Sequence, residues 1–133
     1  MGKLLWQPSE KLIKQANMTR FINFVNKKHG LEINSYTQLY NWSIKNIPDF
    51  WAAMWEFGNI KASHGYDKVV DALGKFPGAR WFIGAKLNFA ENLLRHRDNH
   101  AAFIFRGETQ KSAKMTYAEV YNSVARLAKS LRE

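Results

Sequence analysis

Apolar residues recur at helical spacing in the first part of the chain. A repeat at i, i+3, i+4 and i+7, typical of one face of an α-helix, is formed by Met18, Phe21, Ile22 and Val25. Pro8 and Ser9 can open a shorter helical stretch before this repeat, and Asn17 is positioned to cap its restart. Gly30 is expected to end the second helix, after three basic residues that suit its negative end. Two helices are therefore predicted before residue 31.

A second pair of helices is predicted between residues 35 and 57. Ser35 followed by Gln38 matches a capping box, and Pro48 suits the first turn of the next helix. At 100° per residue the apolar side chains of that helix span an arc of about 160°, wider than a surface helix buries. These side chains are Phe50, Trp51, Met54, Trp55 and Phe57. We therefore expect the helix to lie between two layers.

The tryptophans of this helix have two interpretations. Trp51 and Trp55 lie four residues apart, so their rings could form a stacking box for a flat cofactor. The favoured interpretation is a core stripe, because large rings at helical spacing supply much buried apolar area.

The segment from Gly58 to Gly78 shows weak periodicity. A short helix is predicted over residues 66–73, where Val69, Val70 and Leu73 supply apolar positions. The following sequence, GKFPGAR, contains glycine and lysine but lacks the spacing GxxxxGK[ST] of a phosphate-binding loop. We therefore expect an ordinary connecting loop there.

The stretch ARWFIGAKLNFAENLL, residues 79–94, is the most distinctive in the chain. Residues 80–83 can run extended, and Gly84 permits a turn. Asn88 and Glu91 are spaced as an N-cap pair for a helix that we expect to end at residues 98–100. In that account their polar groups serve backbone donors, which leaves little for a substrate.

The last third of the chain predicts a β-hairpin followed by a helix. The hairpin covers AAFIFRGETQKSAKMTY with Gly107 in the turn, and the continuous apolar run at 103–105 favours a strand covered on both faces. Thr116 and Glu119 form a capping box, and the helix they open carries one apolar face. That face consists of Val120, Val124, Leu127, Ala128 and Leu131.

This ending predicts that the 133 residues are the front part of a longer protein. A single hairpin is marginal alone, and a buried strand followed by an amphipathic helix is how an α/β layer begins. The apolar stripe also reaches Leu131 without a terminating Gly, Asn or Pro. The predicted class is α+β and mostly α.

Composition is that of an ordinary globular domain. Apolar residues make up 46% and charged residues 23% of the chain, and aromatic residues, at 14%, indicate a core or interface built from rings. There is no cysteine, which excludes disulfides and thiolate sites. The apolar run at residues 4–6 is too short for a signal peptide, and no run approaches a membrane span. These features predict a cytoplasmic protein without a membrane partner.

The net charge of +9 raises the question of an anionic partner. The basic residues are dispersed, and the densest cluster is Arg95, His96 and Arg97. No RNP-type strand, zinc knuckle or run of five like charges is present. A solvated basic surface is favoured, so no nucleic-acid partner is predicted. A small basic module that stacks bases on its rings remains an alternative.

Residues able to carry chemistry do not converge in the sequence. The histidines His96 and His100 have the i, i+4 spacing of metal ligands, but Asp98 and Asn99 between them are expected to break the helix. No serine lies in a GxSxG elbow, and no paired carboxylates have apolar surroundings. We therefore predict no catalytic, cofactor-binding or metal-ligating residue in this chain.

Four segments resemble successive blocks of the N-terminal region of acetoacetyl-CoA synthetases, a branch of the adenylate-forming acyl-CoA synthetase superfamily. They are LWQPSEKLIKQANMTRFINFV (4–25), SYTQLYNWSIKNIPDFWAAMWEF (35–57), ARWFIGAKLNFAENLL (79–94) and MTYAEVYNSVARLAKSLR (115–132). The third block is also similar to the acetyl-CoA synthetase pattern. Ala85 stands where that pattern has its second glycine, and NLLRHRD replaces Asn-x-Leu-Asp-Arg-His. These departures favour the acetoacetate branch and leave acetyl-CoA synthetase as the alternative.

The resemblance implies a ligase in which acetoacetate and ATP give an acyl adenylate and pyrophosphate, after which the thiol of CoA displaces AMP. ATP, Mg²⁺ and CoA are implied for the intact enzyme and none for this fragment. These residues do not contain the family's Ser/Thr/Gly-rich loop, its nucleotide motifs or its catalytic lysine. The fragment alone is therefore expected to have no catalytic activity. Residues 1–98 would be a helical extension, and 99–133 the first hairpin and helix of the adenylating domain. The rest of that domain is the implied partner.

Overall fold

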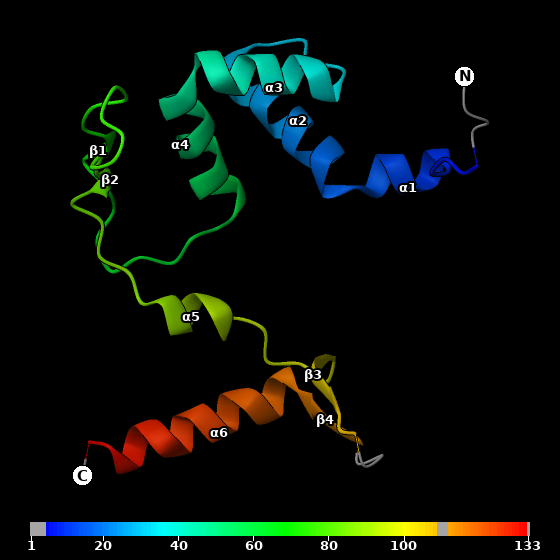
Figure 1. Ribbon diagram of the computed structural model, residues 1–133, viewed down its shortest axis with the longest axis vertical. Helices are drawn as coiled ribbons and strands as arrows, with labels where there is room; N and C mark the ends of the chain where they lie inside the picture. Colours follow the sequence, from blue (N-terminus) through cyan, green and yellow to red (C-terminus); the bar gives the residue numbers. More distant parts are fainter. Residues whose placement is uncertain (1–4, 109–111, 133) are drawn as a thin grey trace. The chain divides into compact units, whose positions relative to one another are not determined.

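The computed structural model describes residues 5–108 and 112–132, and six helices and four short strands lie within these ranges (Figure 1). In chain order they are α1 (Glu10–Gln15), α2 (Asn17–His29), α3 (Tyr36–Lys45), α4 (Ile47–Phe57), β1 (Lys68–Val70), β2 (Trp81–Ile83), α5 (Phe89–Leu93), β3 (Ala101–Arg106), β4 (Ser112–Thr116) and α6 (Tyr117–Ser130). The strands pair as two antiparallel hairpins, β1 with β2 and β3 with β4. The α+β, mostly helical class is confirmed.

The chain divides into two units. Unit 1 comprises Met1–Ile60 with Gly65–Ala85, and unit 2 comprises Lys61–His64 with Lys86–Glu133. Helices α1 to α4 and the first hairpin belong to unit 1, and α5, the second hairpin and α6 belong to unit 2. Each unit is described separately below.

Most helix ends in unit 1 follow the predicted caps. Ser9 caps α1, and Gly30 ends α2 in the left-handed conformation with φ 64°. Ser35 caps α3, because its hydroxyl accepts a hydrogen bond from the Gln38 amide at 3.3 Å. The reciprocal half of the capping box differs from the prediction. The Gln38 side chain accepts from the amide of Asn34, at 2.8 Å, instead of that of Ser35.

The predicted cap at Asn17 is wrong. The break between α1 and α2 occupies one extended residue, Ala16, so Asn17 already lies in the first turn of α2. Its side-chain oxygen accepts from the Arg20 guanidinium at 3.5 Å. The break is also bridged by the Thr19 hydroxyl, which donates to the carbonyl of Ile13 at 2.6 Å. The N-cap of α2 is set by the extended backbone of Ala16, and the residue types around it do not reveal that position.

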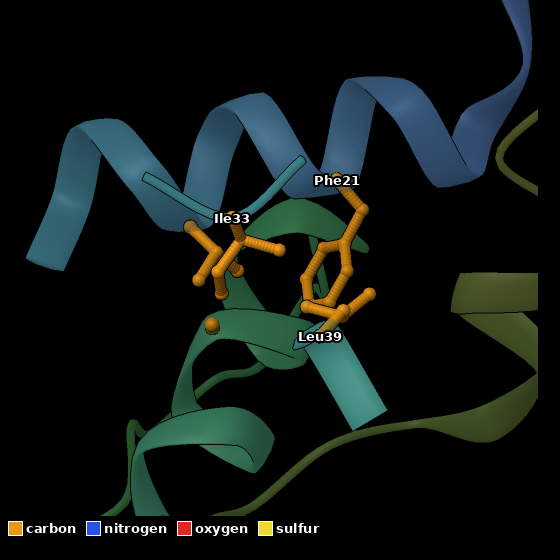
Figure 2. Packing of buried hydrophobic residues seen from close by; sticks show 5 residues of the cluster. Phe21, Ile33 and Leu39 are labelled. Atoms are coloured by element: carbon orange, nitrogen blue, oxygen red, sulfur yellow. The ribbon is translucent and has the colours of Figure 1, made fainter. Parts of the chain in front are cut away.

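The core of unit 1 lies between α2, α3 and α4. Its buried residues are Phe21, Val25, Ile33, Leu39 and Ala53, and Figure 2 shows the side chains of Phe21, Ile33 and Leu39 meeting below α2. The turn after α2 is fixed by Asn26, whose side chain both donates to the Ile33 carbonyl at 2.8 Å and accepts from its amide at 2.9 Å. This pair of bonds places Ile33 in the core.

Helix α4 lies between two layers, as its wide apolar arc predicted. On one side the rings of Phe50 and Phe57 contact Phe21 of α2, with centroids 5.9 and 5.1 Å apart. On the other side Trp51 contacts Trp81 of β2 at 5.9 Å. These edge-to-face contacts are the arrangement that aromatic rings prefer. Pro48 lies in the first turn, also as predicted.

The helix predicted over residues 66–73 is wrong, because Lys68–Val70 forms strand β1. It pairs antiparallel with β2, with Lys68 opposite Ile83 and Val70 opposite Trp81. Val69 and Val70 are β-branched and fit a strand better than a helix. The extended stretch predicted at 80–83 is confirmed, and it supplies the partner strand that β1 needs.

Gly84 is required where β2 ends. Its φ is 85°, and a Cβ added there would lie 2.3 Å from Oδ2 of Asp67. Only glycine avoids both the strained backbone and this overlap.

In unit 2, Asn88 caps α5 as predicted, since its side-chain oxygen accepts from the Glu91 amide at 3.2 Å. The predicted helix end at 98–100 is wrong. Helix α5 stops at Leu93, and Leu94 closes it through a bond from its amide to the Ala90 carbonyl at 2.8 Å. Asp98 instead accepts from the amide of His100 in a local turn.

The second hairpin and the capping box that follows it are confirmed. Strand β3 pairs with β4, and Gly107 lies in their connection, part of which falls outside the described residues. Thr116 and Glu119 exchange both bonds of the capping box that opens α6. The expectation that β3 is covered on both faces is wrong for this chain. Phe103, Ile104 and Phe105 are all exposed, because the described elements that pack extensively on β3 are β4 and α6.

We expect replacement of Phe21 to destabilise unit 1 strongly. Phe21→Ala removes a buried ring that contacts Phe50 and Phe57, and should lower the free energy of unfolding by about 3–5 kcal/mol. Phe76→Ala is the matched control, because Phe76 is 99% exposed. Urea titration of both variants measures the difference, and equal losses would contradict the core assigned here.

We also expect Gly84→Ala to destabilise the β1–β2 hairpin. The positive φ alone costs a non-glycine residue about 1–3 kcal/mol, and the close Asp67 carboxylate adds to it. Gly74→Ala is the control, since a Cβ at Gly74 would meet nothing within 4 Å. Thermal unfolding compares the two, and a Gly84 variant as stable as the control would show that the backbone relaxes freely.

Candidate functional site

The aromatic cluster on α4 and the first hairpin is the candidate cofactor box of the sequence analysis. The centroid distances are 4.8 Å for Trp55–Phe82, and 5.3 Å for both Trp55–Tyr66 and Tyr66–Phe82. Trp51 lies 5.9 Å from Trp81. All four distances are those of rings in direct contact, with no separation for an inserted third ring. The rings therefore pack α4 against the first hairpin, as the core-stripe interpretation predicts for the half-buried Trp55. Trp51 and Trp81 contact each other but are 41% and 43% exposed, so they lie at the rim of this contact and outside the core.

Phe82 holds an unusual backbone conformation in this cluster. Its φ is 47°, in a region that bulky residues rarely adopt. Contacts with both Trp55 and Tyr66 hold its ring. The strained residue is thus supported by packing on two sides.

The base of the loop between β1 and β2 is closed by Asp71 and Arg80. Oδ1 of Asp71 accepts from the Arg80 amide at 2.9 Å and from the Ala72 amide at 2.7 Å, while Oδ2 accepts from Nε of Arg80 at 3.1 Å. The Arg80 amide, followed by its guanidinium, lowers the pKa of Asp71 from 3.8 to about 2. No local sequence motif predicts this pair, because its members lie nine residues apart.

The hydrogen bonds of Asp71 to Ala72 and Arg80, called the Asp71 clamp below, show how the loop GKFPGAR uses its backbone amides. A phosphate-binding loop directs several backbone amides at an anion. Here the amides of Ala72 and Arg80 are directed at the Asp71 carboxylate, which is part of the protein. Phe76, inside the loop, is fully exposed. The loop thus uses its amides for internal structure.

The polar residues of α5 also serve the backbone. The Asn88 oxygen caps the helix, and Asn92 ties the segment at Lys61 to α5. Asn92 accepts from the Lys61 amide at 2.8 Å and donates to the Lys61 carbonyl at 2.9 Å. Within the described residues no hydrogen bond joins the Glu91 carboxylate to the Asn88 amide, so Glu91 does not complete the predicted cap pair.

The two histidines with metal-like spacing point to separate partners. His100 contacts Asp98, with Nδ1 3.0 Å from Oδ1, whereas the His96 ring lies 5.7 Å from that of Tyr117. Hydrogen bonding from the His100 amide lowers the pKa of Asp98. Over residues 5–108 and 112–132, no three His, Asp or Glu side chains gather as a metal site.

The basic cluster at residues 95–97 is partly engaged as well. The Arg97 guanidinium lies 3.9 Å from the centroid of the Tyr121 ring on α6, within the range of a cation–π contact. In the part of the chain that the structure describes, no helix is both long and apolar enough to cross a membrane.

Known proteins are similar to this chain in sequence and in fold. A family model described as acetyl-coenzyme A synthetase N-terminus matches residues 36–93. The acetoacetyl-CoA synthetase of Xenopus tropicalis is 39% identical over 135 residues, covering 99% of this chain and 20% of that protein. The solved acetoacetyl-CoA synthetase from Streptomyces lividans is 37% identical with a TM-score of 0.83, covering 98% of this chain and 21% of that one.

The chain is homologous to the N-terminal region of acetoacetyl-CoA synthetases. The resemblance found in the sequence is confirmed, and the chain spans about a fifth of the length of these relatives. A protein of Penicillium aethiopicum named malonamoyl-CoA synthetase is also similar, at 36% identity over 98% of this chain. Similarity in this region therefore does not by itself separate one acyl substrate from another.

The Asp71 clamp should make hairpin stability depend on pH. Because the folded pKa lies below the ordinary 3.8, the clamp stabilises the fold above that pH and is lost as the pH falls through about 2. Asp71→Asn should lower the urea midpoint at neutral pH, and its difference from the unmodified chain should shrink between pH 4 and 2. Glu32→Gln serves as an exposed control. A difference that is constant with pH would contradict the assigned role.

Proposed function

We propose that this chain is the N-terminal part of an ATP-dependent acetoacetate–CoA ligase. The observation that carries the proposal is similarity over nearly the whole chain to acetoacetyl-CoA synthetases of animals and of Rhizobium meliloti, at 35–39% identity. The intact enzyme would join acetoacetate to ATP as an acyl adenylate and then transfer the acyl group to the thiol of CoA. ATP, Mg²⁺ and CoA would serve that reaction, in the cytoplasm.

In this proposal the fragment has a structural role. The polar groups that could have formed a site are bonded within the fold: Asp71 to Arg80 and Ala72, and Asn88 and Asn92 to backbone groups. The aromatic rings of α4 pack against one another and against the first hairpin. The reacting groups would therefore come from the remaining four-fifths of the enzyme.

The proposed domain division follows the family resemblance. Residues 1–98 would form the helical extension, and 99–133 the first hairpin and helix of the adenylating domain. Unit 2 begins earlier in the chain, because Lys86 pairs with His64 and Asn92 bonds to Lys61. The units describe how this chain packs, whereas the proposed division concerns the architecture of the whole enzyme.

The prediction that the fragment has no catalytic activity can be tested with the purified chain. Incubation with ATP, Mg²⁺, acetoacetate and CoA should produce no acetoacetyl-CoA above a protein-free control. Product formed in proportion to the amount of chain would contradict the structural role.

The ligase assignment has a separate test, because the coding sequence that follows residue 133 should specify a Ser/Thr/Gly-rich loop followed by lysine. Its product should use acetoacetate in preference to acetate.

A further inference from the structure

Helix α5 is too short to be stable by itself. It runs from Phe89 to Leu93, and isolated helices shorter than about 12 residues are marginal in water. Apolar burial does not make up the difference, because Phe89 is 72% exposed and Leu93 is 58% exposed. Within this helix, all of which the structure describes, the one half-buried residue is the polar Asn92. The hydrogen bonds of Asn92 therefore matter more for α5 than apolar packing does.

Asn92 bonds to the backbone of a residue that lies 31 positions earlier in the chain. Its side-chain carboxamide accepts from the amide of Lys61 at 2.8 Å and donates to the carbonyl of Lys61 at 2.9 Å. Asn26 pairs with the backbone of Ile33 in the same way in unit 1. This pairing needs a donor and an acceptor on one short side chain. Aspartate lacks the donor and leucine lacks both, so asparagine is required.

The segment that Asn92 binds is a strap, Lys61–His64, which lies in unit 2 although the chain on both sides of it lies in unit 1. The strap also pairs with Lys86. The carbonyl of Lys86 accepts from the Ser63 amide at 2.8 Å, and the amide of Lys86 donates to the His64 carbonyl at 3.0 Å. The strap is thus fastened within unit 2 at two places, by a side chain at its start and by backbone bonds at its end.

Both ends of the strap are fixed by unit 1. Before the strap, the amide of Ile60 donates to the carbonyl of Trp55 in α4 at 3.3 Å. After it, the ring of Tyr66 packs on the rings of Trp55 and Phe82, with both centroid distances 5.3 Å. A loop whose ends are fixed loses less conformational freedom when it binds. Unit 1 therefore presents the backbone of the strap in place for Asn92.

We propose that the strap Lys61–His64 transmits the stability of unit 1 to α5, and that the Asn92 carboxamide is the group that fastens it. Unit 1 has a buried core, which includes Phe21 and Val25, and it holds the strap from both ends. The strap in turn holds α5. Release of the carboxamide should unfold α5 locally while unit 1 stays folded. This role goes beyond the proposed function and does not depend on which acyl group the intact protein uses.

Hydrogen exchange on the 133-residue chain tests the fastening. The reporter of α5 is the Leu94 amide, which bonds to the Ala90 carbonyl. Asn92→Leu and Asn92→Asp should each speed its exchange at least tenfold, whereas exchange of the Asp67 amide in unit 1 should not change. An unchanged Leu94 amide would overturn the inference, because α5 would then not need Asn92. Equal acceleration of both amides would also overturn it, because Asn92 would then stabilise the whole chain.

Asn88→Asp is the matched control, since it makes the same chemical change in the same helix. Asn88 caps α5 with its side-chain oxygen, and aspartate supplies an equivalent oxygen. Exchange of the Leu94 amide should therefore stay within about twofold of that in the unmodified chain. An effect as large as that of Asn92→Asp would show that a carboxylate beside α5 is sufficient. That result would overturn the role assigned to the carboxamide.

Trypsin provides a second measurement, because the strap contains the Lys61–Ala62 bond. A fastened segment resists proteolysis and an opened one is cleaved. In the two Asn92 variants, cleavage at this bond should be at least tenfold faster, while cleavage after the exposed Lys75 of the β1–β2 loop should keep its rate. Equal acceleration at both bonds, or none at Lys61, would overturn the inference.

Removal of an anchor tests whether stability passes through the strap. Tyr66→Leu loses the aromatic contacts after the strap but keeps an apolar side chain. It should speed exchange of the Leu94 amide in the unmodified chain, and should have no further effect in the Asn92→Leu chain, where the strap is already released. The same acceleration in both chains, or none in either, would show that α5 does not depend on unit 1 through Asn92.

Discussion

The architecture of unit 1 depends on a single helix whose apolar side chains point in two directions. The arc on α4 is too wide for one neighbour, so the helix must be covered twice. Phe50 and Phe57 satisfy one side by packing on Phe21 of α2, and Trp51 and Trp55 satisfy the other by packing on β2 and Tyr66. Ala53, which is fully buried, brings α4 close to its neighbours. The first hairpin is held against α4 by the contacts of Trp51 and Trp55.

Features that depend on nearby residues were predictable from the sequence, whereas features that depend on distant partners were not. The caps at Ser9, Ser35 and Thr116 were correct because each hydroxyl bonds an amide three residues away. The sequence predicts a helix where strand β1 lies, because the formation of β1 depends on a partner strand that begins at Trp81. Two adjacent valines favour a strand, but a run this short does not establish one until its partner is known.

The difference between local and distant partners also explains which polar contacts of the candidate site could be predicted. That Asn88 would serve as a cap followed from its spacing to Glu91, and the structure confirms the bond. The Asp71–Arg80 clamp could not be derived in this way, since nine residues separate the two and the hairpin brings them together. The family resemblance supplied what local spacing could not, because ordered blocks along the chain carry information about the whole enzyme.

The error about β3 is informative in physical terms. The run from Phe103 to Phe105 predicted a strand with both faces buried, and in this chain all three side chains are exposed. A hydrophobic pattern reflects the surroundings in which a sequence functions, and that environment can include polypeptide beyond the residues at hand. α4 has both of its layers within this chain, so most of its apolar side chains are partly buried, although Trp51 stays 41% exposed. Among the described residues, the elements that pack on β3 are β4 and α6, so the apolar pattern of β3 exceeds its burial in this chain.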